Sequence, residues 1–73
     1  MSYYTFKRDK TCLGMPMEVC LVGRKPVGCI EVTYRGKWEV IWATGATELR
    51  KKVAEIAMRK RCTELNASQW MGI

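Results

Sequence analysis

The chain has 73 residues, 48% of them apolar, and 13 Lys and Arg against 7 Asp and Glu give it a net charge of +6. A chain of this length folds as one domain around one modest core, with no room for a substrate cleft beside that core. It contains no apolar run near the roughly 18 residues of a membrane span, and residues 1–10 lack the apolar segment of a signal peptide. We therefore expect a single cytoplasmic domain over residues 1–73.

The N-terminal segment, residues 1–14, combines aromatic and basic side chains. It carries Tyr3, Tyr4, Phe6, Lys7, Arg8 and Lys10. Aromatic residues with neighbouring arginines are enriched at the centres of protein interfaces, whereas in a small domain the same aromatics also cover a sheet edge. Both interpretations stay open, so we expect the segment to be either a fourth, edge strand or an arm that binds a partner.

Residues 15–42 predict an antiparallel meander of three strands. Apolar and polar side chains alternate over 15–21, 28–34 and 38–42, and this period of two is typical of strands with one buried face. We expect a buried face made of Met15, Met17, Val19, Leu21, Ile30, Val32, Tyr34, Trp38, Val40 and Trp42. The solvent-exposed face would then carry Glu18, Cys20, Val22, Cys29, Glu31, Thr33, Glu39 and Ile41.

The first hairpin is expected to turn at residues 24–25, between a glycine and a proline. This turn sets Val19 against Ile30 on the buried face. It also places Cys20 opposite Cys29 on the exposed face, where a disulfide that forms in air would be incidental.

The second hairpin is expected to have a three-residue loop, residues 35–37, with Gly36 free to adopt positive φ. This loop sets Tyr34 against Trp38. Both hairpins then present their apolar side chains on the same face of the sheet, and this agreement supports the meander.

Residues 46–62 predict a helix, capped by Thr44 or Thr47, and residues 63–73 a C-terminal tail. One stripe at helical spacing is expected to lie on the sheet: Leu49, Val53, Ile56 and Ala57. The predicted fold class is therefore α+β, a three-stranded antiparallel meander, or four-stranded with the N-terminal segment, packed against one C-terminal helix.

No catalytic residue, metal site or cofactor is expected. The chain contains no histidine, so a nucleophilic side chain would lack its usual base. Its cysteines, Cys12, Cys20, Cys29 and Cys62, are widely spaced, whereas structural zinc sites draw their ligands from close pairs. We expect free thiols and a protein that is not an enzyme.

Basic residues occur at both predicted hairpin tips, near the N-terminus and around the helix. Together with the N-terminal aromatics, the expected partner contacts are Tyr3, Tyr4, Phe6, Lys7, Arg8, Arg24, Lys25, Arg35, Lys37, Arg50, Lys51, Arg59 and Arg61. Charge scattered in this way is typical of a solvated surface. A nucleic-acid-binding module that contacts phosphates through its tips and helix is the alternative function, although the carboxylates on the predicted exposed face argue against base reading.

From residues 1–7 (MSYYTFK) to residues 70–73 (WMGI), the chain resembles the small early transcription regulators of lytic phages, a family of RNA polymerase-binding proteins with a member in the Xanthomonas phage Xp-ten. The resemblance rests on length, basic charge and the compact α+β layout. It implies binding to the largest subunit of bacterial RNA polymerase, near its N-terminus, in the host cytoplasm. It also implies inhibition of promoter initiation and promotion of antitermination. We expect the protein to be a monomer.

Overall fold

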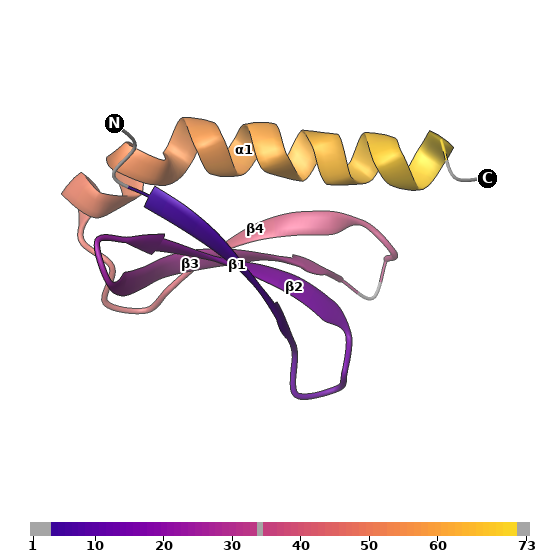
Figure 1. The fold of residues 1–73 in the computed structure, drawn as a ribbon, viewed down its shortest axis with the longest axis horizontal. Helices are drawn as coiled ribbons and strands as arrows, with labels where there is room; N and C mark the ends of the chain where they lie inside the picture. The colour runs from indigo at the N-terminus through magenta and orange to yellow at the C-terminus, as the bar shows by residue number, and fades with distance from the viewer. Residues whose placement is uncertain (1–3, 34, 72–73) are drawn as a thin grey trace.

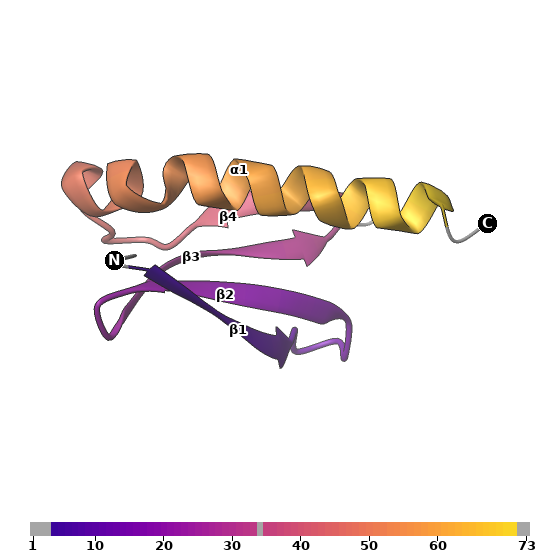
Figure 2. The same ribbon diagram turned by 45° about the horizontal axis from the view of Figure 1, so that its top comes forward.

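The computed structural model describes residues 4–33 and 35–71, except for the side chains of residues 69–71. Its elements are β1 (Tyr4–Lys10), β2 (Pro16–Val22), β3 (Lys25–Val32), β4 (Trp38–Trp42) and α1 (Glu48–Met71). The strands form one antiparallel sheet in the order β1-β2-β3-β4, and α1 lies across one face of this sheet (Figures 1 and 2). The predicted α+β meander with one C-terminal helix is confirmed.

Residues 4–10 of the N-terminal segment form the edge strand β1, as the first of the two interpretations predicted. Its pairing with β2 runs from Tyr4 opposite Val22 to Lys10 opposite Pro16. Tyr4 and Phe6 face the helix side, where they pack against the core with their ring centroids 5.8 Å apart. Tyr3 lies outside the described residues.

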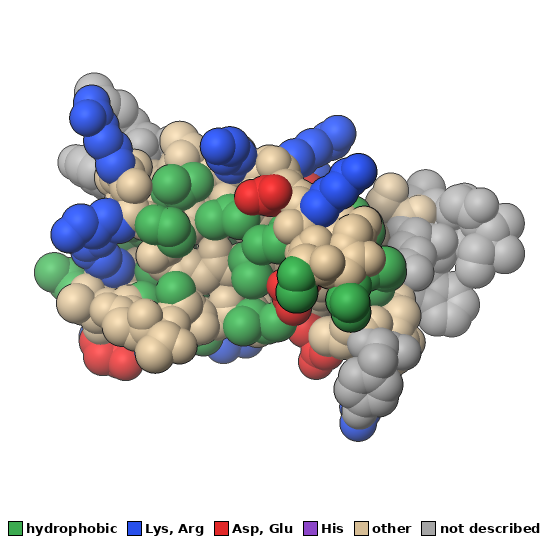
Figure 3. Space-filling model, turned by 90° about the horizontal axis from the view of Figure 1, so that it is seen from below, with side chains coloured by type: hydrophobic (Ala, Val, Ile, Leu, Met, Phe, Trp, Pro, Cys, Tyr) green, Lys and Arg blue, Asp and Glu red, His purple; other side chains and the backbone are tan. Residues whose placement is uncertain are grey.

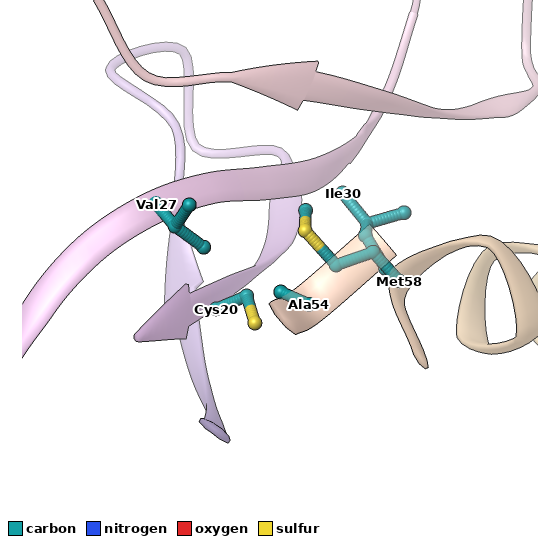
Figure 4. Close-up of a cluster of buried hydrophobic side chains, with 5 residues drawn as sticks. All are labelled: Cys20, Val27, Ile30, Ala54 and Met58. Carbon is teal, nitrogen blue, oxygen red and sulfur yellow. The ribbon is translucent and has the colours of Figure 1, made fainter. Parts of the chain in front are cut away.

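The core lies between the middle of the sheet and the helix. Its fully buried side chains come from β2, β3 and α1, and they are Cys20, Val27, Ile30, Ala54 and Met58 (Figure 4). The helix comes close to β3 because Gly28 has no side chain: a Cβ there would stand 2.7 Å from the Ile41 carbonyl oxygen and 3.2 Å from Met58 Cε.

The predicted register of the first hairpin is wrong. The turn falls on Gly23 and Arg24, one residue early, because Gly23 adopts φ 67° at the first turn position, as type II′ turns require. Val27 then forms a bulge between two ladder pairs, so that Val19 faces Cys29 and not Ile30.

This shift reverses the two faces of β2. Glu18, not Val19, lies opposite Ile30, and both Glu18 and Cys20 point toward the helix. A slip of one residue has this effect because successive strand side chains point to opposite faces. The expected neighbourhood of Cys20 and Cys29 is also wrong, since the two thiols lie on opposite faces, and both are free.

The predicted register of the second hairpin, with residues 35–37 as its loop, is wrong, because Lys37 already bonds to Thr33. The Thr33 N–H donates to the Lys37 carbonyl at 2.9 Å, and Trp38 pairs with Val32, not with Tyr34. Gly36 does adopt positive φ, at 77°. Because the ladder moves by two residues in total, the β4 side chains keep their predicted face. Position 34 itself lies outside the described residues.

The helix is longer than predicted and rotated. It begins after Thr47, whose hydroxyl accepts a hydrogen bond from the Arg50 N–H at 3.3 Å, and it continues to Met71 through the expected tail. The predicted stripe is wrong, because Leu49 and Ile56 are 76% and 79% exposed. The covered face is made by Ala54, Met58, Arg61, Cys62, Leu65 and Asn66.

Candidate protein-binding surface

The face of the sheet opposite α1 is uncovered by any element among the described residues, and we call it the open sheet face. Figure 3 looks onto it and shows hydrophobic side chains gathered over its middle, with Lys and Arg toward its margins. Because β2 is reversed, this face receives side chains that were expected in the core. Its apolar residues are Met17, Val19, Leu21, Cys29 and Ile41.

The centre of the open sheet face is one cross-strand row through all four strands. Lys7, Val19, Cys29 and Ile41 are successive partners in the ladder. Ile41 is 41% exposed, whereas Val19 and Cys29 are partly covered by their neighbours in the sheet. A second row, Thr5 with Leu21 and Pro26, extends the apolar area toward the β2–β3 turn.

Carboxylates line the opposite end of the same face. The row there consists of Asp9, Met17, Glu31 and Glu39, with the two glutamates directly paired. The Cys29 thiol donates to Glu31 Oε2 at 3.7 Å. Burial, together with the nearby Glu31 charge, raises the pKa of Cys29, so the thiol stays neutral and serves as an apolar side chain.

Glu18, expected in solvent, is instead part of a clamp between β2 and α1. Its side chain is only 9% exposed, and its two oxygens accept hydrogen bonds from Arg61 Nε and Nη2 at 2.9 and 2.8 Å. These hydrogen bonds lower the pKa of Glu18, although burial opposes the shift. Arg61, a predicted partner contact, therefore links α1 to β2 within the domain.

Asn66 forms a second clamp, between α1 and the backbone of β4. The Trp38 N–H donates to Asn66 Oδ1 at 2.9 Å, and Asn66 Nδ2 donates to the Trp38 carbonyl at 3.2 Å. The Cys62 thiol donates to the same carbonyl at 3.2 Å. Sequence reasoning placed Asn66 in a polar tail. The signal for a longer helix was that residues 62–71 contain no glycine or proline that would end it.

The other predicted contacts are spread over the molecule. Lys7 lies on the open sheet face and Arg8 on the helix side, near Glu18 and Arg61. Arg24 and Lys25 lie at the β2–β3 turn, Arg35 and Lys37 lie between β3 and β4, and Arg50, Lys51 and Arg59 lie on α1.

Small groups of these basic side chains share a hollow. Lys25 lines one together with Arg50, and Arg8 lines another together with Arg61. On the helix, Lys51 and Arg59 are engaged with glutamates at 3.4 and 3.9 Å. The structure thus forms no continuous basic stripe among the described residues of the predicted contact set.

A comparison of the chain with family models, curated proteins and solved structures found no match. No helix within the described residues is long and apolar enough to cross a membrane. Those residues also bring together no group of three His, Cys, Asp or Glu side chains that could hold a metal ion. The fold and its surface define a small α+β domain whose sheet has one covered and one open face.

Proposed function

We propose that this chain is a non-enzymatic regulator that docks its open sheet face onto a protein, and that this protein is bacterial RNA polymerase. The observation that carries the docking is the apolar centre of the open sheet face, over Val19, Leu21 and Ile41, which no described element covers. The choice of polymerase rests on the resemblance to phage transcription regulators, from which inhibition of initiation and promotion of antitermination follow.

The distribution of side chains on this face supports a protein partner. Interfaces between proteins have an apolar centre and a polar, charged rim. The open sheet face has Val19, Leu21 and Ile41 near its middle, Lys7 on the edge strand, and Glu31 among the carboxylates at one end. Contiguous exposed apolar surface on a small domain is typical of interaction sites.

Binding to nucleic acid, the alternative, finds less support in the geometry. Asp9, Glu31 and Glu39 lie on the face that a sheet-reading module would turn toward the bases, where phosphates would repel them. The Arg61 guanidinium is held by Glu18. The remaining cations lie at separate turns and around the helix, an arrangement suited to weak, salt-sensitive contact with phosphates.

A pull-down tests the proposed partner. The wild-type protein, immobilised through a tag, should retain the polymerase subunits from a bacterial lysate and should bind purified core polymerase at physiological salt. Absence of polymerase from the eluate, together with no binding of the purified enzyme, would remove the proposal.

A salt titration against random-sequence DNA separates the two functions. Contact through phosphates weakens steeply as salt rises, since each contact releases counterions. We expect no measurable DNA binding at physiological salt, alongside polymerase binding that survives it. Micromolar DNA binding without polymerase binding would favour the alternative.

A further inference from the structure

The two edges of the sheet differ in their protection against pairing with another strand. β1, at one edge, carries four consecutive charged residues over 7–10, which is how natural proteins guard an edge. β4, at the other edge, reads WEVIW and has Glu39 as its one charged residue. β4, with a single charged residue, is therefore the edge that is less protected against a further strand.

The ladder between β3 and β4 shows which backbone groups point to that edge. In an antiparallel pair, hydrogen-bonded and non-hydrogen-bonded residue pairs alternate. Bonds from Thr33 N–H to the Lys37 carbonyl and from Ala43 N–H to the Val27 carbonyl, both 2.9 Å, fix the alternation at the two ends.

The residues of β4 divide accordingly. Glu39 and Ile41 bond to β3, whereas Trp38, Val40 and Trp42 turn their N–H and C=O groups away from it. At Trp38 these groups are taken by the Asn66 amide, at 2.9 and 3.2 Å. The backbone groups available at the edge are thus those of Val40 and Trp42, which offer two donors and two acceptors.

We propose that two copies of this chain pair through β4 as antiparallel strands, with Val40 of each copy opposite Trp42 of the other. In this register each Val40–Trp42 pair exchanges both of its hydrogen bonds. The arrangement is symmetric and uses only backbone groups for which the described residues of the monomer provide no partner. Centring the pair on Val40 would instead place Trp38 opposite Trp42, and the Trp38 groups are held by Asn66.

The side chains agree with this register. Ile41, which is 41% exposed, meets Ile41 of the second copy at the two-fold axis on the open sheet face. Glu39 falls opposite Ala43 and not opposite another carboxylate. On the helix side, the incoming Trp42 side chain would lie opposite Val40, beside a hollow that Val40, Arg59 and Cys62 help to line.

Pairing would turn the two sheets into one continuous sheet. The open sheet faces of both copies would join along Ile41, which doubles the apolar surface offered to a partner. The proposed dimer differs from the monomer expected from the sequence, and it does not depend on which partner the protein binds.

The test is the oligomeric state of the purified protein, measured by sedimentation equilibrium over a wide concentration range. Wild type should dimerise reversibly. Ile41→Lys and Ile41→Glu should each weaken dimerisation at least tenfold, because like charges then meet at the axis, and mixing the two variants should restore a heterodimer. Ile56→Lys, an equal change on the exposed side of α1, should leave dimerisation unchanged.

A second readout needs no variant. Amide hydrogen exchange at Val40 and Trp42 in the wild type should slow as protein concentration rises, because the dimer bonds these groups. A wild type that stays monomeric at millimolar concentration overturns the proposal. A dimer that Ile56→Lys abolishes and Ile41→Lys spares also overturns it, since the helix would then be the interface. Concentration-independent exchange at both amides, with added polymerase protecting them, would assign the edge to that partner instead.

Discussion

The Glu18 carboxylate is held inside the domain by the guanidinium of Arg61, through hydrogen bonds of 2.9 and 2.8 Å. Removing one partner of such a pair leaves an uncompensated buried charge, whereas replacing both with apolar side chains of similar size costs little. The pair therefore makes an inward-facing carboxylate tolerable on β2, and it ties that strand to α1. The intact pair contributes little to the net free energy of unfolding, whereas removal of either partner alone destabilises the domain.

Arg61→Ala should lower the free energy of unfolding by about 2–3 kcal/mol. The loss is smaller than for a fully dry pair, because the Arg61 side chain is 33% exposed. Urea unfolding measures it, and Glu18→Leu combined with Arg61→Leu should recover most of it. The control, Arg59→Ala, removes only a surface contact of 3.9 Å and should change stability by less than about 0.5 kcal/mol. A double variant no more stable than Arg61→Ala would contradict this account.

The same pair predicts how stability depends on pH. The hydrogen bonds from Arg61 lower the pKa of Glu18 in the folded state. Its contribution to stability is therefore present above the unfolded pKa of about 4.3, and it is lost as the pH falls through the lower folded value. Urea unfolding from about pH 5 downward should show this loss in the wild type.

In Arg61→Ala the contribution of Glu18 should change sign, because burial, which raises the pKa of Glu18, then outweighs the charge of Arg8, which lowers it. Stability at acidic pH should then fall less steeply than in the wild type. Equal pH slopes in the two proteins would mean that Glu18 does not depend on Arg61.

At the scale of elements, α1 shows that hydrophobicity does not choose the buried face by itself. Leu49, Val53 and Ile56 form the more apolar stripe, yet the helix turns Ala54 and Met58 to the sheet. Small Ala54 permits close approach. Polar residues farther along the same face bind to the sheet, as Arg61 does to Glu18. The periodicity of the helix sequence cannot reveal such contacts, because the partners lie on strands distant in the sequence.

Met58 and Ile56 give a direct test of the orientation of the helix. Met58→Ala should cost about 2–5 kcal/mol, since it empties a fully buried site. Ile56→Ala, only two positions away and 79% exposed, should change stability by less than about 0.5 kcal/mol. Thermal or urea unfolding of both variants decides the matter, and the reverse order of losses would restore the face predicted from the sequence.

The strands were predictable and their registers were not, for a reason that lies in the turns. Alternation over β2, β3 and β4 identified three strands correctly. Gly23 and Arg24 compete with Arg24 and Lys25 for a two-residue turn, and only the left-handed conformation of Gly23 decides between them. The bulge at Val27 leaves no pattern of its own. Moving the turn by one residue shifts the register by two and leaves each side chain on its face, so the bulge at Val27 is what decides which face of β2 is buried.

At the scale of the whole molecule, the candidate surface could not be predicted because it depends on that reversed strand. With β2 in the expected orientation, Glu18 would have joined Glu31 and Glu39 on a largely acidic, solvated face. In the structure Val19 and Leu21 occupy this face and make it apolar. The positions of charged residues in the sequence pointed instead to basic side chains at the turns and on the helix. The sequence does not reveal whether these side chains lie close together in space.

The central claim is that the protein binds its partner through the open sheet face. Leu21→Lys tests it well, because the ladder partners of Leu21 are Thr5 and Pro26, so no like charge opposes the new lysine. Two control variants change charge outside the open sheet face. They are Ile56→Lys on the exposed side of α1, and Arg24→Glu with Lys25→Glu at the β2–β3 turn.

The measurement is the dissociation constant of each variant for purified bacterial RNA polymerase at physiological salt, with circular dichroism to show that each variant is folded. Leu21→Lys should raise the dissociation constant at least tenfold, since a charge is then buried in the apolar part of the interface. Ile56→Lys should leave it within about twofold of wild type, within the small effects expected outside an interface centre. Wild-type affinity in Leu21→Lys, with a loss in the turn variant, would contradict the account and assign binding to the basic turn.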